Sequence, residues 1–200
     1  VVYNWGQNST YGGENHAGCE AKKFNMINNF YKPGPYTQTI AGRSDRLLNP
    51  TTQCSNCNKE DKTNVVPGKF FISGNIVNDE PATVSKKNIS FDGNYSLDLF
   101  KQNCILSERA LSDDYDFKSY STISVHSARK AYESVVAYAG ASFKRDMVDS
   151  EVCDDVRNGT ARYRGSKTGD AGLIDSQNDR KGIGESAWQK LQGASMVDTD

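Results

Sequence analysis

The sequence has few large apolar residues, no excess of charge of either sign and no long hydrophobic run. Leu, Ile, Val and Phe make up 38 of its 200 residues, which is enough for one small hydrophobic core. Lys and Arg number 24 against 25 Asp and Glu, a balance that argues against nucleic acid as a partner. No stretch approaches the roughly 20 consecutive apolar residues that span a bilayer, so no membrane span is predicted.

A signal peptide is also missing from the beginning of the chain. Residues 1–5 have neither a positively charged nor a long apolar segment and resemble a strand interior. Residues 195–200 stop within an acidic run. We therefore expect one piece of a larger, secreted protein, whose targeting segment lies upstream or has been removed.

The five cysteines are an odd number, which leaves at least one thiol free or paired outside this chain. Cys54 and Cys57 form a lone C-x-x-C. A structural zinc site normally needs a second pair of ligands, and His16 and His126 do not lie at a ligand spacing. We expect a local disulfide between Cys54 and Cys57, with zinc as the alternative.

Four N-x-S/T sequons permit N-glycosylation in a eukaryotic secretory pathway. They begin at Asn8, Asn88, Asn94 and Asn158. A chain this rich in Asn and Ser produces some sequons by chance. Alone they are weak evidence for an extracellular glycoprotein, and the odd cysteine count fits a fragment of a larger protein.

Short apolar runs alternate with Gly and Asn from residue 1 to about residue 77, and this pattern predicts strands at 1–5, 23–31 and 69–77. The last two share a sequence motif, in which a run of residues that favour strands is followed by Asn and then by further apolar residues. This repetition predicts successive coils of a parallel solenoid. We expect Asn28 or Asn29 to stack on Asn75 at the turns.

Polar stretches at 37–64 and 79–124 are predicted to be long loops. Helical periodicity appears only at 127–140, with Ser127 and Gly140 as caps, and at 150–157. We expect residues 1–124 to form the coils with their loop insertions, and residues 125–200 to form a helical and irregular extension packed on them. In the first helix, the packing residues are predicted to be Ala131, Tyr132, Val135 and Val136.

Two groups of short motifs lie near the two ends of this pattern. The first comprises Val2-Tyr3-Asn4-Trp5-Gly6, residues 8–14 and residues 28–35; the second comprises Ala131-Tyr132-Glu133 and residues 137–142, 144–146, 148–149 and 155–160. In this order they resemble the pectate lyases, family 1 of the polysaccharide lyases. The first group is similar to the segments that follow the active site, and the second is similar to the C-terminal extension. The long loops and the Cys54–Cys57 pair do not match.

The resemblance implies an all-β fold: a right-handed parallel β-helix, present here as a partial solenoid with long loops and a short α-helical C-terminal extension. It also implies a parent protein that cleaves acidic polysaccharide by Ca²⁺-dependent β-elimination. That reaction needs carboxylates to hold Ca²⁺, cations to stabilise the enolate and an Arg as the base. In these lyases that set lies upstream of the motif matched at residues 2–6. We therefore assign no catalytic residue, metal ligand or cofactor to this chain.

Whether the protein is an enzyme stays open at this stage. The alternative to a lyase is a non-enzymatic β-helix module of an extracellular, glycosylated filament or cell-surface assembly, in which open strand edges pair with neighbouring copies. The candidate partners are therefore a pectate-like acidic polysaccharide or copies of the same chain.

Arg43 and Arg46 are the candidate substrate-binding residues, because two arginines in one loop can line a groove for uronate carboxylates. The alternative is a solvated pair beside an aspartate. His16 is a candidate metal or acid–base residue, with a surface histidine as its alternative. Asp113, Asp114 and Asp116 have the density of a calcium site without its glycine and distal glutamate, which favours a hydrated acidic loop.

Overall fold

The computed structural model describes residues 1–52, 65–92, 96–103 and 124–180. Within these residues the strands are short, from two to five residues. In chain order they are β1 (Val2–Tyr3), β2 (Tyr11–Gly12), β3 (Asn15–His16), β4 (Lys23–Ile27), β5 (Phe30–Lys32), β6 (Asn49–Pro50), β7 (Val65–Val66), β8 (Lys69–Ser73), β9 (Ile76–Val77) and β10 (Glu80–Pro81). The helices are α1 (Pro35–Thr39), α2 (Leu97–Asn103), α3 (Ala128–Tyr138) and α4 (Met147–Asn158), followed by a 3₁₀-helix, Gln177–Arg180.

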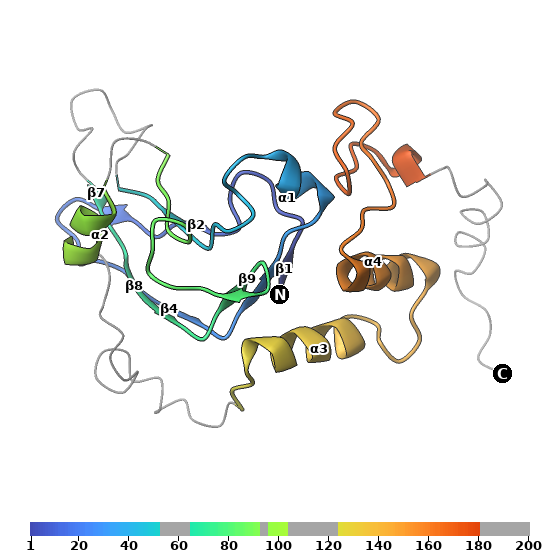
Figure 1. The fold of residues 1–200 in the computed structure, drawn as a ribbon, viewed down its shortest axis with the longest axis horizontal. Coiled ribbons are helices and arrows are strands. Elements are labelled where there is room, and N and C mark those ends of the chain that lie inside the picture. The colour runs from blue at the N-terminus through green and yellow to red at the C-terminus, as the bar shows by residue number, and fades with distance from the viewer. Residues whose placement is uncertain (53–64, 93–95, 104–123, 181–200) are drawn as a thin grey trace.

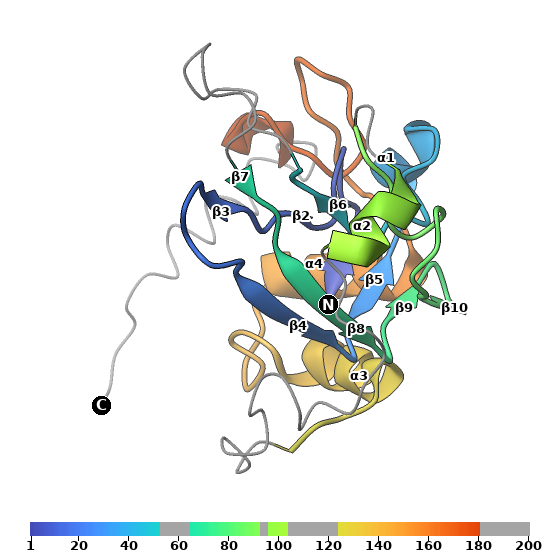
Figure 2. The same ribbon diagram turned by 90° about the vertical axis from the view of Figure 1, so that its left-hand side faces the viewer.

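The strands of this part of the chain fall into four small sheets. The largest has the order β1-β5-β9-β10, with parallel pairing except between β9 and β10. β2 pairs with β6 and β4 with β8 in parallel, whereas β3 and β7 are antiparallel. β4 and β8 run side by side in both views (Figure 1, Figure 2).

The predicted fold class, an all-β parallel β-helix, is wrong. The described residues form a mixed α/β structure, whose separate sheets join into neither a closed nor a solenoid sheet. Two antiparallel pairs interrupt the parallel ones, and helices occur where loops were predicted. The physical reason for α1 is Pro35 at its first position, where a fixed φ favours the helix and the missing N–H costs no bond.

The contact between the two related segments is confirmed. Phe24 pairs with Phe70 in register, and their rings stack with centroids 5.0 Å apart. At the turns, the Asn75 side chain is 1% exposed. It accepts hydrogen bonds from the backbone N–H and the amide of Asn29 at 2.9 and 3.0 Å, and it donates to the Met26 carbonyl at 2.7 Å. Like residues therefore pair in a local ladder, although the sheets do not form a solenoid.

The hydrophobic core lies between these strands and α2. Phe100 of α2 is fully buried and contacts the rings of Phe70 and Phe91. Trp5 packs edge-on against Tyr31, with ring centroids 6.3 Å apart. The remaining buried members of this cluster are Met26, Leu47, Leu48, Ile72, Val77 and Ile89.

Helix α3 confirms the predicted helix at 127–140. Ser127 accepts a hydrogen bond from the Lys130 N–H at the N-cap, and Gly140 follows the helix at a positive φ of 70°. Tyr132 stacks on Phe30 of β5, with centroids 4.5 Å apart. The predicted packing face is only partly right, because Val136 is buried while Val135 is 40% exposed.

Helix α4 contacts α3 and lies beside it in Figure 1. It begins three residues before the predicted helix at 150–157 and ends at Asn158, capped by Gly159 in the left-handed conformation at φ 69°. Val152 is 56% exposed, and the buried side chain of α4 is Glu151. Among the described helices, none is long and apolar enough to span a membrane.

Candidate functional site

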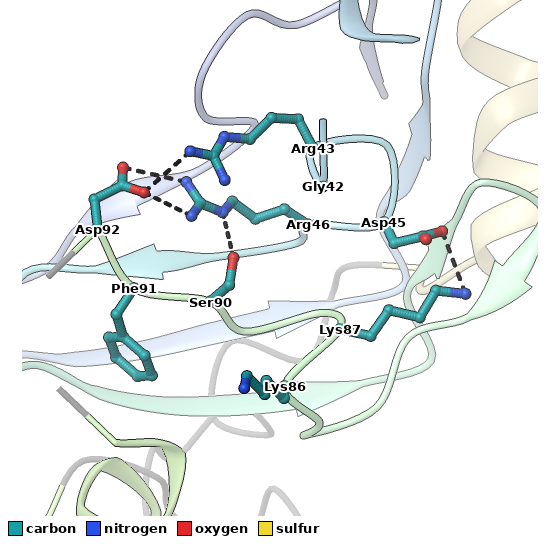
Figure 3. A pocket seen from close by; sticks show the side chains of 9 residues that line it. All are labelled: Gly42, Arg43, Asp45, Arg46, Lys86, Lys87, Ser90, Phe91 and Asp92. Atoms are coloured by element: carbon teal, nitrogen blue, oxygen red, sulfur yellow. Dashed lines mark hydrogen bonds and ion pairs between the residues drawn. The ribbon is translucent and has the colours of Figure 1, made fainter. Parts of the chain in front are cut away.

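A cleft of about 460 Å³ lies between the loop that follows α1 and the segment that follows β10 (Figure 3). Its size is within the range of about 300–1,000 Å³ that is typical of small-ligand pockets. The lining is mostly polar and charged. It consists of Gly42, Arg43, Asp45, Arg46, Lys86, Lys87, Ser90, Phe91 and Asp92.

Arg46 forms the fixed part of the cleft. Its side chain is 1% exposed, and its guanidinium donates to the Asn8 side-chain oxygen at 2.7 Å, to Asp92 at 2.8 Å and to the Ser90 hydroxyl. A buried cation is stable only when its donors find acceptors, and these oxygens supply them. Arg46 therefore serves mainly to hold the wall of the cleft together.

Asp92 connects the two arginines. Arg43 Nη2 lies 3.1 Å from the same Asp92 oxygen that Arg46 contacts, and Figure 3 shows both guanidinium groups directed at this carboxylate. The hydrogen bond from Arg46 lowers the pKa of Asp92 below its ordinary value, against a smaller opposing effect of burial, and the charges of Arg46 and Arg43 lower it further. The carboxylate is 48% exposed, so one side of it remains open to solvent.

The opposite wall is a turn that carries Lys86 and Lys87. Lys87 pairs with Asp45 at 3.3 Å, and both side chains are partly open to solvent. Lys86 is also exposed, and among the described residues no ion pair or hydrogen bond engages its ammonium group. This ammonium is therefore available to an anion from solution.

The charges of the lining do not cancel. Four cations, Arg43, Arg46, Lys86 and Lys87, face two carboxylates, Asp45 and Asp92, which leaves an excess of two positive charges. Each carboxylate is already paired with a cation, so neither is placed as a free general base. The arrangement is suited to holding an anion.

The structure brings together both arginines that the sequence suggested, in different roles: Arg46 is buried, and Arg43 is partly exposed. Sequence reasoning missed Asp92 and the two lysines. The available signal was the adjacent Lys86-Lys87 pair inside a Ser- and Asn-containing turn, which was interpreted only as part of a polar loop.

The sequons lie in very different environments. The Asn8 side-chain oxygen accepts a hydrogen bond from Arg46. Asn88 is 5% exposed and both ends of its amide are engaged, so the folded chain has no room for a glycan there. Asn158 is exposed at the end of α4, and Asn94 lies outside the described residues.

The remaining candidates lie away from the cleft or outside the described residues. His16 is exposed on β3. The three aspartates at 113, 114 and 116 and the Cys54–Cys57 pair lie outside the described residues. Cys19 and Cys153, the two described cysteines, form no disulfide with each other. In the part of the chain that is described, no group of three or more His, Cys, Asp or Glu side chains could hold a metal ion.

A second cluster of charges surrounds Glu151, which is 8% exposed. Its carboxylate accepts hydrogen bonds from Arg180 at 2.7 Å and Tyr163 at 2.9 Å, and it pairs with Arg162 at 3.2 Å. Burial and the bond to this carboxylate raise the pKa of Tyr163. These groups satisfy one another and anchor the segment after α4, so we interpret the cluster as structural.

Comparison of the chain with protein-family models, with curated proteins and with solved structures found no match in any of the three. The resemblance to pectate lyases thus rests on the short motifs quoted above. The physical case for a function rests on the cleft.

Proposed function

We propose that this chain is the acidic-polysaccharide-binding part of a larger, secreted, pectate-lyase-like protein, and that the cleft between Arg43 and the Lys86-Lys87 turn holds the carboxylates of the polymer. The observation that carries this proposal is the excess of two positive charges in the lining. A polyuronate presents one carboxylate per sugar, so two cationic walls can engage successive residues of one chain.

The expected affinity is modest. Each ion pair to an exposed Lys or Arg contributes about 0–1 kcal/mol, so binding depends on several contacts made together. Ions screen exposed charges over about 8 Å at physiological ionic strength, which means that salt should weaken the complex. Phe91 adds an apolar surface against which the C–H face of a sugar ring can pack.

Calorimetric titration of the chain with oligogalacturonate tests the proposal. We expect binding that weakens as NaCl is raised, and none to the fully methyl-esterified oligosaccharide, which has the same ring but no charge. Equal binding of the two oligosaccharides, or binding of neither, would show that the cleft does not recognise uronate carboxylates.

Matched variants locate the site. The double variant Lys86→Gln and Lys87→Gln removes the charge of one wall while keeping side-chain length, and should weaken binding about three- to tenfold. Lys144→Gln removes an exposed lysine between α3 and α4 and should leave binding unchanged. If both changes had the same effect, binding would reflect net charge and not the cleft.

For the parent protein we propose Ca²⁺-dependent β-elimination, with the catalytic centre outside this chain. The resemblance supports this, because in these lyases the catalytic set lies upstream of the motif matched at residues 2–6. Residues 1–200 mixed with polygalacturonate and Ca²⁺ should therefore produce no rise in the ultraviolet absorbance of the unsaturated product. A rise would place the reaction within this chain and make Arg43 the first residue to replace.

The second candidate is a non-enzymatic module of an extracellular assembly. The observation in its favour is that β1 and β2 are end strands of their sheets, and no other described strand pairs with their outer edges. Unpaired edges are templates for strands of another chain. Sedimentation over a range of concentrations tests this, and a monomer at every concentration would reject self-assembly.

A further inference from the structure

Asn88 is the last residue of the turn that forms the lysine wall of the cleft, and its side chain is 5% exposed. The amide oxygen accepts a hydrogen bond from the Thr83 N–H at 2.9 Å, and the amide nitrogen donates to the Asp45 carbonyl at 2.7 Å. The backbone carbonyl of Asn88 accepts from the N–H groups of Leu47 and Leu48 at 2.8 and 3.0 Å. One residue thus joins the lysine turn to the segment that carries the arginines.

The turn itself is closed by Ser85. Its carbonyl accepts hydrogen bonds from the N–H groups of Asn88 and Ile89 at 3.1 and 2.8 Å, and its hydroxyl lies 3.4 Å from the Asn88 amide oxygen. Lys86 and Lys87 occupy the two positions between Ser85 and Asn88. Their side chains extend into solvent. The backbone of the turn therefore determines the points from which the two side chains extend.

We propose that Asn88 is a positioning residue of the anion-binding cleft, which fixes Lys86 and Lys87 opposite Arg43 before a ligand arrives. This inference rests on the function proposed above. Ordering a flexible, charged side chain on binding costs free energy, and a turn fixed in advance reduces that cost. The same contacts occupy the Asn88 amide, so this sequon serves the fold and does not carry a glycan.

A double-mutant cycle separates positioning from a general loss of stability. Asn88→Ala should weaken the binding of oligogalacturonate by about three- to tenfold in the wild-type background. In the background of the Lys86→Gln and Lys87→Gln double variant, it should cause no further loss, because there is no lysine charge left to position. An equal loss in both backgrounds would overturn the inference.

Amide hydrogen exchange tests positioning without any ligand. Asn88→Ala should accelerate exchange of the Asn88 and Ile89 N–H groups, which close the turn. Val136→Ala, a change to a buried residue of α3, is the control: it should lower stability without raising exchange at the turn relative to the rest of the protein. If Asn88→Ala does not fold, Asn88→Ser, which keeps a short polar side chain, replaces it.

Different results would contradict the positioning role of Asn88 and the proposed binding function of the cleft. Unchanged exchange at the turn in the Asn88 variant would overturn the positioning role, even with the lysines shown to bind the polymer. Unchanged binding after removal of both lysine charges would overturn the proposed function, and with it any role of Asn88 in binding.

Discussion

Arg46 is a cation that the chain buries almost completely and surrounds with oxygen atoms. Asn8 comes from one segment and Ser90 and Asp92 from another, and the guanidinium holds all three in place. The planar group with its five donors is suited to this role, which a lysine could not fill. The stability of the cleft therefore depends on Arg46 much more than on the partly exposed Arg43.

Replacing Arg46 with alanine should destabilise the fold by about 2–4 kcal/mol, because it leaves buried oxygen atoms without donors and removes a paired charge. Arg43→Gln should cost less than about 1 kcal/mol, since its ion pair is partly exposed to solvent. Urea denaturation of the two variants gives both values. Similar costs for both would mean that Arg46 does not organise the wall.

The ionisation of Asp92 makes a pH-dependent contribution to stability. Its pKa in the folded state lies below the ordinary value of 3.8, so the unfolded chain takes up the proton first as pH falls. The contribution is fully present above the unfolded pKa and is lost as pH falls through the folded one. The stability difference between wild type and Asp92→Asn should thus be constant from about pH 5 to 7 and shrink below about pH 4. A difference that grows in acid would contradict this.

Among the individual residues of the cleft, the sequence predicted only some. Arg43 and Arg46 stand three positions apart, so their association was predictable. Their common partner Asp92 is 46 positions from Arg46, and no local pattern marks it. The lysines were equally hidden, because their place opposite the arginines depends on the bonds of Asn88 to a distant segment.

Helices and strands were predictable from the sequence where the periodicity of apolar residues was strong and agreed with a single type of element. The related phrases at 24–31 and 70–77 predicted that their Asn turns would meet, and Asn29 does contact Asn75. Helix α1 was missed because its five residues, which begin at the last proline of a Pro-Gly-Pro run, are too few to show a helical period. The assembly of strands into small separate sheets was missed because pairing depends on long-range contacts.

Helix α3 was predicted with the right residues and a rotated packing face. The spacing of apolar residues left both Val135 and Val136 as candidates, whereas the side chains that meet β5 and α4 follow a narrower strip through Ala128, Tyr132 and Val136. Four-residue spacing keeps these three on one face. The surface against which the helix packs decides which of the candidate residues are buried. The sequence of the helix alone does not specify that surface.

The two valines of α3 form a matched pair for testing this face. Val136→Ala should cost about 1–2 kcal/mol, because it removes two buried methyl groups. Val135→Ala should change stability by less than about 0.5 kcal/mol, since Val135 is 40% exposed and alanine favours the helix. Both values come from chemical denaturation, and similar costs for the two variants would show that the predicted face, which contains both valines, was right.

At the scale of the whole molecule, residues near the N-terminus hold the segments after residue 150. Tyr3 donates its hydroxyl to the Thr160 carbonyl, and burial, followed by the nearby charge of Asp155, raises the pKa of Tyr3 to about 12. Lys32 donates to the Arg157 carbonyl at 2.7 Å. The described parts of residues 1–124 and 125–180 are therefore joined by polar contacts as well as by the stacking of Tyr132 on Phe30.

Asn4 is the most connected of these links. Its side chain is 7% exposed and accepts hydrogen bonds from the N–H groups of Tyr36 and Thr37 at the start of α1, while its amide donates to the Ala171 carbonyl at 2.8 Å. The residue adopts a positive φ of 51°, which asparagine tolerates better than most residues. A single side chain thus fixes three segments that are far apart in the sequence.

Replacement of Asn4 should separate these segments. Asn4→Gly keeps the backbone conformation and removes the hydrogen bonds, with an expected cost of about 1–3 kcal/mol. Asn4→Ala should cost about 1 kcal/mol more, because alanine is strained at a positive φ. Hydrogen exchange should then accelerate both at the start of α1 and around residues 171–172, with Asn25→Ala, an exposed change on β4, as the silent control. Acceleration at α1 alone would show that the segment around Ala171 is held by other contacts and that Asn4 acts only within the first half of the chain.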